Sequence, residues 1–333
     1  MPTAPEVAAS AKALTPEPVV ARLAKKPLKL SAGKLIRKFV CRAVHPAHLY
    51  RGWRLQANRK SLRRATYDGQ LALYAQLFPN GFLHYGYFDD PTIKPNEMSL
   101  SDIELAQARY AQLLMDLAGD RDRPVLDVGC GMGGMSRMLV EQGYDTTALT
   151  PDRKQVAHIR QTLAHIPVIK SRFEDLPVEP HRGKYGTVFT SESLQYLKLD
   201  IALPKLEEVL APGGSWIACD YFRMQPTGHA TGHVWDPFVE QLNAHGWRVT
   251  YEQDITANVL PTLRYIHMWA TRFGQPLLTY GIRRMERKQP GLHHLLNTVL
   301  ADIEGAIDDN IALIDPDQFS ANKRYMLLKI ERA

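Results

Sequence analysis

A short stretch between residues 125 and 136, VLDVGCGMGGMS, places several glycines and one carboxylate where a strand turns into a helix. The apolar run Val125–Val128 predicts a buried parallel strand, and Met135–Gln142 has the composition of the helix that follows. A glycine lets the backbone approach a ligand where a Cβ atom would collide with it. The spacing G-x-G-x-x-G, which begins at Gly129, therefore indicates a binding loop for a nucleotide-like ligand, against the alternative of an ordinary strand-to-helix turn.

The carboxylate of this stretch indicates which ligand. A dinucleotide places its pyrophosphate on the helix N-terminus, where an acid just before the first glycine has no obvious partner. The acid suits a ligand that carries a cationic amino group and no phosphate, which describes S-adenosylmethionine. The stretch resembles the first motif of the class I S-adenosylmethionine-dependent methyltransferases, hhD-h-G-x-G-x-G. Four residues match it position by position, namely Asp127, Gly129, Gly131 and Gly133.

The resemblance extends to about residue 254, because strand and helix patterns alternate along this region. Further strands are expected at Asp145–Thr150, Ile166–Phe173, Gly186–Ser193 and Ala211–Phe222. Helices are expected at Lys154–Leu163 and Leu203–Leu210. Beyond them we expect a sixth strand in Thr250–Leu263, helices over Arg264–Asn310 and a last strand at Lys323–Arg332. The likeness implies an α/β protein with a Rossmann-like methyltransferase fold, in which helices cover both faces of a mostly parallel sheet.

Composition divides the chain into three parts. Residues 1–20 are rich in Ala and Pro and lack an apolar signal core, so they are expected to form a flexible tail. Residues 21–99 are expected to form a basic helical arm and an aromatic cofactor lid, and residues 100–333 the methyltransferase domain. Within that domain a helical insertion at about 262–320 is expected to cover the acceptor pocket as a C-terminal helical lid. Core packing of an added helical layer is the alternative role for most of its apolar residues.

Two positions depart from the commonest pattern of the family. The second strand ends in Thr150, where most members carry an acid that binds both ribose hydroxyls. Thr150 and Gln155 instead fit the variant G-I-T-L-S-x-x-Q, which methyltransferases on the cyclopropane-fatty-acid, tocopherol and isoprenoid side of the family carry. Near the third strand, the usual adenine-contacting Asp aligns with Arg172, so Phe173 and Glu174 are expected beside the adenine.

An aromatic segment precedes the domain at Phe82–Asp90 and resembles the H-x-G-Y/F-x segment of small-molecule and lipid methyltransferases. Tyr85 and Tyr87 alternate with Gly86, so both rings are expected on one side of an extended chain. A sulfonium is a cation, and aromatic faces stabilise cations by roughly 0.5 to 2 kcal/mol. Both tyrosines are therefore expected to contact the cofactor. The alternative is a hydrophobic staple before a helix.

A second acidic position follows the fourth expected strand, in the segment SESLQYL between residues 191 and 197. Open α/β sheets bind their ligands at this end of the strands, so Ser191 is expected to contact the cofactor. In related isoprenoid and tocopherol methyltransferases a Glu in a comparable context stabilises a developing carbocation or takes a proton, and Glu192 matches it. Glu192 and Tyr196 are therefore the candidate catalytic residues. The alternative for Glu192 is a strand-end carboxylate bonded to neighbouring backbone amides.

The basic charge of the chain is concentrated near its N-terminus. Residues 22–64 contain 14 Lys or Arg and no Asp or Glu, which leaves 27 basic and 35 acidic residues, a net charge of −8, for the rest. Within this arm, Leu35–Leu55 interleaves apolar and aromatic residues with cations, as helices on anionic membrane surfaces do. A helical extension that packs on the core is the other main interpretation. Nucleic acid is an unlikely partner, since no RNA-binding module accompanies the patch.

The remaining composition excludes several classes of site. Three cysteines, Cys41, Cys130 and Cys219, are odd in number and widely spaced, which argues against a disulfide framework or a metal cluster, so no metal is expected. No apolar run reaches the ~20 residues that a membrane helix needs. A cytoplasmic protein is expected, with a peripheral position at the membrane surface if the arm binds lipid. The sequence does not indicate an oligomeric state.

Together these patterns predict methyl transfer from S-adenosylmethionine to a hydrophobic small-molecule, lipid or isoprenoid-type acceptor, at carbon. An N-methyltransferase that acts on a small amine would use the same cofactor site and is the alternative among enzymes. A non-catalytic cofactor-binding or membrane-tethered scaffold is the alternative of another class. A nicotinamide-dependent oxidoreductase is disfavoured by the acid before the glycines and by the non-acidic end of the second strand.

Overall fold

The computed structural model describes residues 44–57, 79–226 and 232–333, and the chain divides into two compact units, Met1–Arg59 and Lys60–Ala333. In the first unit the described residues form helix α3 (Pro46–Ala57), which exposes Leu49, Tyr50 and Trp53. A helix within the expected arm is thus present. The expected tail at 1–20 and residues 21–43 and 58–64 of the arm lie outside the described residues, so membrane contact through the arm stays a prediction.

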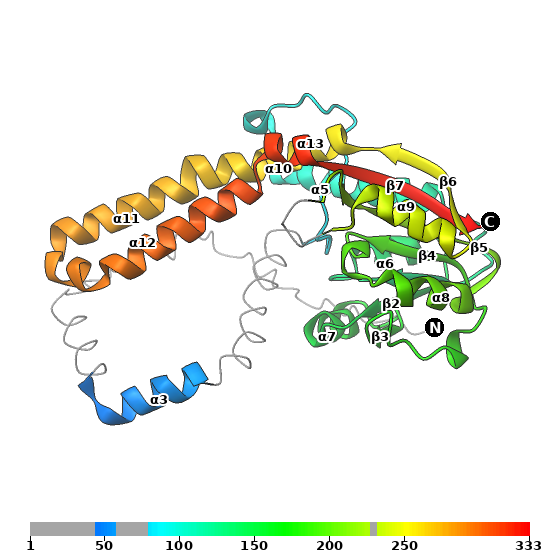
Figure 1. Cartoon of the computed structure of the whole chain (residues 1–333), viewed down its shortest axis with the longest axis horizontal. Helices are drawn as coiled ribbons and strands as arrows, with labels where there is room; N and C mark the ends of the chain where they lie inside the picture. The colour runs from blue at the N-terminus through cyan, green and yellow to red at the C-terminus, as the bar shows by residue number, and fades with distance from the viewer. Residues whose placement is uncertain (1–43, 58–78, 227–231) are drawn as a thin grey trace, which may run out of the picture. The chain divides into compact units, whose positions relative to one another are not determined.

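The second unit is built around a seven-stranded sheet with the order β3-β2-β1-β4-β5-β7-β6 (Figure 1). Its strands are β1 (Val125–Val128), β2 (Thr146–Thr150), β3 (Val168–Lys170), β4 (Tyr185–Ser191), β5 (Leu210–Arg223), β6 (Trp247–Asp254) and β7 (Lys323–Arg332). The first five pair in parallel, whereas β7 lies antiparallel between β5 and β6. The mostly parallel sheet expected from the sequence is confirmed.

Helices cover both faces of this sheet. They are α5 (Leu100–Asp116), α6 (Gly134–Glu141), α7 (Arg153–Thr162), α8 (Leu199–Val209), α9 (Trp235–Ala244), α10 (Thr256–Trp269), α11 (Gln275–Lys288), α12 (Pro290–Leu313) and α13 (Pro316–Asn322). Successive residues of a strand point to opposite faces. In β7, Tyr325 and Leu327 accordingly enter the apolar cluster that contains α5 and α10, and Met326 and Leu328 enter the cluster that contains α8 and α9. Burial on both faces explains why central strands such as β1 and β7 carry runs of apolar residues without alternation.

The expected helical insertion forms a long helical hairpin. Helix α10 continues through a π-helical segment, η4 (Ala270–Gly274), into α11, and α12 returns alongside α11 (Figure 1). Neither α11 nor α12 contains a buried residue. Among the described residues, no helix combines the length and apolar character needed to cross a bilayer.

Candidate active site

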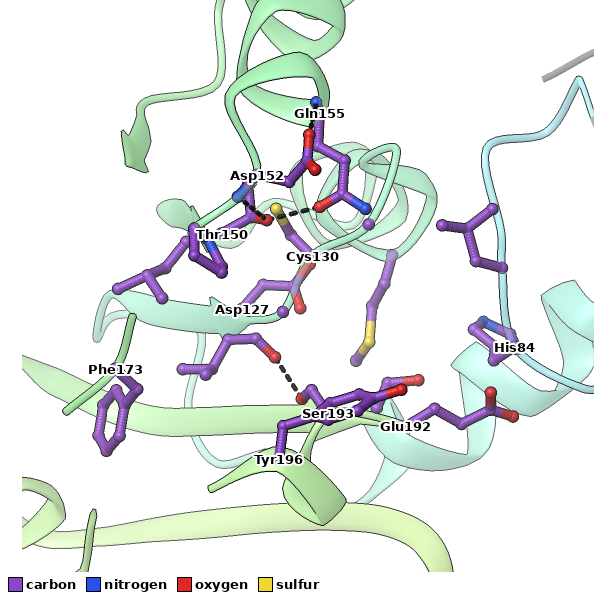
Figure 2. Close-up of a pocket in the computed structure, with 18 of the residues that line it drawn as sticks. His84, Asp127, Cys130, Thr150, Asp152, Gln155, Phe173, Glu192, Ser193 and Tyr196 are labelled. Atoms are coloured by element: carbon purple, nitrogen blue, oxygen red, sulfur yellow. Dashed lines mark hydrogen bonds between the residues drawn. The ribbon is translucent and has the colours of Figure 1, made fainter. Parts of the chain in front are cut away.

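A cavity of about 560 Å³ opens at the carboxyl ends of β1, β2 and β4. Parallel α/β sheets bind ligands at this edge, and the volume falls within the ~300–1,000 Å³ that is common for small-molecule sites. Figure 2 shows Gln155 at one end of the cavity, Glu192 and His84 at the other, and Asp127 between them. Ten residues that the sequence singled out line it, namely Asp127, Gly129, Gly131, Thr150, Gln155, Phe173, Glu174, Ser191, Glu192 and Tyr196.

The glycine loop brings its backbone against neighbouring segments. Gly129 has φ +79°, and a Cβ atom there would lie 2.4 Å from the Cβ of Ser193. Ser193 in turn donates a hydrogen bond of 2.6 Å to the carbonyl of Val128. Gly131, with φ +56°, lines the cavity. Gly133, with φ +88°, caps α6 and lies outside the cavity lining, so its expected contact with the cofactor stays a prediction.

Asp127 is a buried carboxylate in the wall of the cavity. Burial raises its pKa to about 6, even though a hydrogen bond of 2.5 Å donated by the Ser136 hydroxyl acts to lower it. Asp127 is therefore largely ionised at neutral pH. In the described part of the chain, no cationic side chain contributes to stabilising this buried charge. A cationic amino group in the cavity would stabilise this charge, because an opposite charge favours the ionised form.

Thr150 and Gln155, the two residues that fit the variant motif, meet at the end of β2. The Thr150 hydroxyl donates to Gln155 Oε1 at 2.5 Å, and both side chains are buried. Asp152, which none of the sequence motifs includes as a site residue, also lines the cavity. Its Oδ1 accepts hydrogen bonds from the backbone N–H groups of Lys154 and Gln155 and so caps α7, while Oδ2 takes part in neither bond. An Asp directly before a helical pattern is a recognisable N-cap, which could have located this residue.

Glu192 lies immediately after β4 in a left-handed backbone conformation, with φ +50°, and is the only non-glycine residue with a positive φ in the described part of the chain. Its Oε1 accepts hydrogen bonds from the Tyr85 N–H at 2.8 Å and from the Tyr325 hydroxyl at 2.5 Å. Burial raises the pKa of Glu192 to about 7, although both hydrogen bonds lower it. At neutral pH this carboxyl group can therefore hold or release a proton.

Further buried titratable groups surround Glu192, and sequence reasoning missed them. Burial and the nearby charge of Glu192 together raise the pKa of Asp220 on β5 to about 8. The hydroxyl groups of Tyr325 and Tyr110 lie 3.2 Å apart. Burial and then the charge of Glu192 raise the pKa of Tyr325 well above its usual value, so Tyr325 is a hydrogen-bond donor at neutral pH.

Tyr85 and Tyr87 do not line the cavity; they pack against the apolar cluster beside α5 and α10. The Tyr85 ring lies 5.9 Å from that of Tyr325. Two hydrogen bonds from backbone N–H groups hold the segment in this position. The Gly86 N–H donates to Thr262 Oγ1, and the Tyr87 N–H donates to the Ala106 carbonyl. Contact of these rings with the cofactor stays a prediction without a supporting contact.

The preceding residues, Phe82, Leu83 and His84, line the cavity in their place. His84 Nδ1 lies 2.7 Å from the Tyr85 carbonyl, so it carries the proton, and Nε2 is a buried acceptor without a hydrogen-bond partner. Burial lowers the pKa of His84 to about 4, which keeps the ring neutral. Ser191 Oγ, also on the lining, is likewise buried and unpaired. Because buried polar atoms are rarely left unpaired, these two atoms indicate polar groups of a ligand.

The other expected residues lie around the rim and the adenine side. Phe173 is buried in the lining, and Glu174 Oε1 accepts a hydrogen bond of 3.1 Å from the Lys198 N–H. Tyr196, expected to be catalytic, is 73% exposed and lies at the mouth of the cavity. A position at the mouth suits contact with an entering acceptor better than contact with the buried reacting atoms, and its catalytic role stays a prediction.

Comparisons with known proteins agree with this geometry. Residues 125–214 match the family model described as a methyltransferase domain. The chain is 29% identical to a fatty-acid O-methyltransferase of Mycolicibacterium smegmatis over 42% of its own length and 52% of that protein. It is 29% identical to the 2-methyl-6-phytyl-1,4-hydroquinone methyltransferase of Synechocystis sp. over 47% and 48% of the two chains. The chain thus spans about half the length of these relatives.

The fold has a counterpart among solved structures. The geranyl diphosphate C-methyltransferase of Streptomyces coelicolor superposes with a TM-score of 0.53 at 16% identity, over 77% of this chain and 94% of that one. At this identity the likeness concerns the fold alone. Residues 125–214 therefore form a methyltransferase domain, on a Rossmann-like fold.

Proposed function

We propose that the protein transfers the methyl group of S-adenosylmethionine to a hydrophobic acceptor of lipid or isoprenoid type, at a carbon atom. The observation that carries this proposal is Glu192, a strained and partly buried carboxyl group with a pKa near 7 at the end of the cavity opposite Gln155. Strained residues are concentrated at functional sites. A carboxyl group of this kind can stabilise a positive charge that develops on carbon or accept the proton released after carbon methylation.

The cavity fits the cofactor. When bound, S-adenosylmethionine supplies an electrophilic methyl group on a sulfonium. Asp127 would hold its cationic amino group, and the backbone at Gly129 and Gly131 would approach it closely. Thr150 and Asp152 would hold the ribose hydroxyls of the cofactor. In this role, the carboxylate of Asp152 would replace the acid that is missing from the end of β2.

The other wall of the cavity suits an apolar acceptor. Leu83, Phe82 and Leu197 contribute apolar surface, and Tyr196 stands at the mouth. These side chains would exclude water and orient the acceptor, so that most of the rate enhancement would come from positioning. The names of the relatives, a fatty-acid O-methyltransferase and a prenylated-hydroquinone methyltransferase, support an acceptor of this class.

The helical insertion was expected to cover this pocket. Among the described residues that line the cavity, none belongs to residues 262–320. The covering role of the insertion therefore stays a prediction.

Methyl-labelled S-adenosylmethionine and three acceptor classes would test the proposal. A prenylated quinol, a fatty acid and a small amine are incubated with the protein, and mass spectrometry locates the label on carbon, oxygen or nitrogen. We expect carbon-bound label on the prenylated acceptor, lost in Glu192→Gln by roughly tenfold or more but kept in Glu240→Gln, an exposed control on α9. Label on the amine alone would support the N-methyltransferase. Cofactor binding without transfer to any acceptor would favour a scaffold.

A further inference from the structure

An aromatic and apolar stripe runs along the outer face of the continuous helix α10–η4–α11. Its members recur at spacings of three and four residues, as they must to share one side of a helix. They are exposed by 38% to 67%, and they are Ile266, Trp269, Phe273, Leu277 and Tyr280. The rings of Trp269 and Phe273 stack with centroids 4.4 Å apart. A contiguous exposed stripe of this kind marks an interaction surface.

The stripe ends in a cluster of arginines. Arg283, Arg284 and Arg287 line an open hollow on α11 together with Tyr280. The Arg284 guanidinium donates a hydrogen bond of 2.9 Å to the Tyr280 hydroxyl and lies 6.0 Å from the centre of its ring. Long cationic side chains beside aromatic rings are typical of surfaces where an apolar phase meets water.

Charge along the insertion is strongly separated. Residues 255–301 contain six Lys or Arg and a single acid, Glu286, whereas residues 302–317 contain six acids and no Lys or Arg. The stripe therefore belongs to the cationic portion. This charge disfavours the basic arm at residues 22–64, with its 14 cations, as the occupant of the stripe.

We propose that the stripe of α10–α11 and its arginine cluster dock the protein on an anionic lipid bilayer. Trp269, Phe273 and Leu277 would enter the boundary between headgroups and acyl chains, while Arg283 and Arg284 contact lipid phosphates or carboxylates. Such docking goes beyond the proposed methyl transfer and does not depend on it. It would also keep the enzyme where hydrophobic acceptors are dissolved.

Full-length protein, vesicle flotation and paired variants test this proposal. Vesicles are made of phosphatidylcholine alone or of phosphatidylcholine mixed with phosphatidylserine. Phe273→Glu/Leu277→Glu and Arg283→Glu/Arg284→Glu should each weaken partitioning onto the anionic vesicles by about tenfold or more. The matched controls are Leu105→Glu, at an equally exposed leucine on α5, and Arg153→Glu/Arg160→Glu on α7; both should bind like the wild type. Unchanged melting temperatures check that all variants fold.

Tryptophan quenching by brominated lipids separates the hairpin from the arm. Among the described residues, the exposed tryptophans are Trp53 in the first unit and Trp269 in the second. Quenching should survive in Trp53→Phe and be largely lost in Trp269→Phe. The opposite pattern would overturn the proposal, and so would wild-type binding by Phe273→Glu/Leu277→Glu. A concentration-dependent dimer that this variant abolishes, without vesicle binding by the wild type, would assign the stripe to a second copy and also overturn it.

Discussion

The substitution Glu192→Gln should make the fold more stable at alkaline pH. The amide oxygen can still accept the hydrogen bonds from the Tyr85 N–H and the Tyr325 hydroxyl, so the change mainly removes a charge. Folding raises the pKa of Glu192 from 4.5 to about 7. Protonated Glu192 therefore contributes stability that is fully present below about pH 4.5 and is lost as the pH rises through about 7. At about 1.4 kcal/mol for each pH unit, the loss amounts to roughly 3.5 kcal/mol as an upper bound.

Urea unfolding of both proteins at two pH values measures this effect. The difference in unfolding free energy between Glu192→Gln and wild type should grow by about 2 to 3 kcal/mol in favour of the variant between about pH 5 and pH 8.5. Comparing the two proteins cancels the titration of Asp127, whose pKa does not depend on Glu192. The charge of Glu192 raises the pKa of Asp220, so its removal also favours the variant at alkaline pH. Glu240→Gln, on the surface of α9, should show no such change. An equal difference at both pH values would refute a folded-state pKa near 7 for Glu192.

Three further outcomes concern the cofactor and the carboxyl network. Asp127→Asn should weaken the affinity for S-adenosylhomocysteine, measured by calorimetry, by about tenfold or more. The affinity of the wild type should decrease when the pH is lowered below about 6, whereas that of the variant should not depend on pH in this range. Gly129→Ala should abolish this binding because the new Cβ atom would lie 2.4 Å from the Cβ of Ser193. The control Gly143→Ala has a comparable φ but no atom within 4 Å of the new Cβ, so it should bind normally. Tyr325→Phe should raise the pKa of Glu192 further, and unfolding titrations should place its loss of stability at higher pH than in the wild type.

Most of the sheet could be predicted because its central strands, such as β1, β2 and β4, are buried on both faces. The predicted limits of Val125–Val128 and Lys323–Arg332 agree with β1 and β7. The third strand is shorter than expected: only Val168–Lys170 is paired, since a strand at the edge of the sheet has one neighbour, β2. Local patterns thus located the strands well and their ends less well where only one partner fixes the register.

The surroundings of Glu192 could not be predicted, because they depend on pairings between distant segments. Tyr325 lies 133 positions from Glu192, and Tyr85 lies 107 positions away. The aromatic segment was singled out for its rings, yet the Tyr85 atom that reaches Glu192 is a backbone nitrogen, to which side-chain type gives no clue. His84 had a signal, as the first residue of the H-x-G-like segment, but its burial depends on stacking against Tyr110, 4.2 Å away.

The bonding of Glu192 favours a role in chemistry over a role in local structure. A carboxylate that only terminates a strand would accept hydrogen bonds from backbone amides of its own turn. Glu192 instead bonds to one amide and one hydroxyl from distant segments, both through Oε1, which leaves Oε2 out of either bond. Its left-handed backbone costs of order 1–3 kcal/mol, and its burial opposes ionisation. A glycine would relieve the first cost and a glutamine the second, so the fold alone does not account for a glutamate at this position.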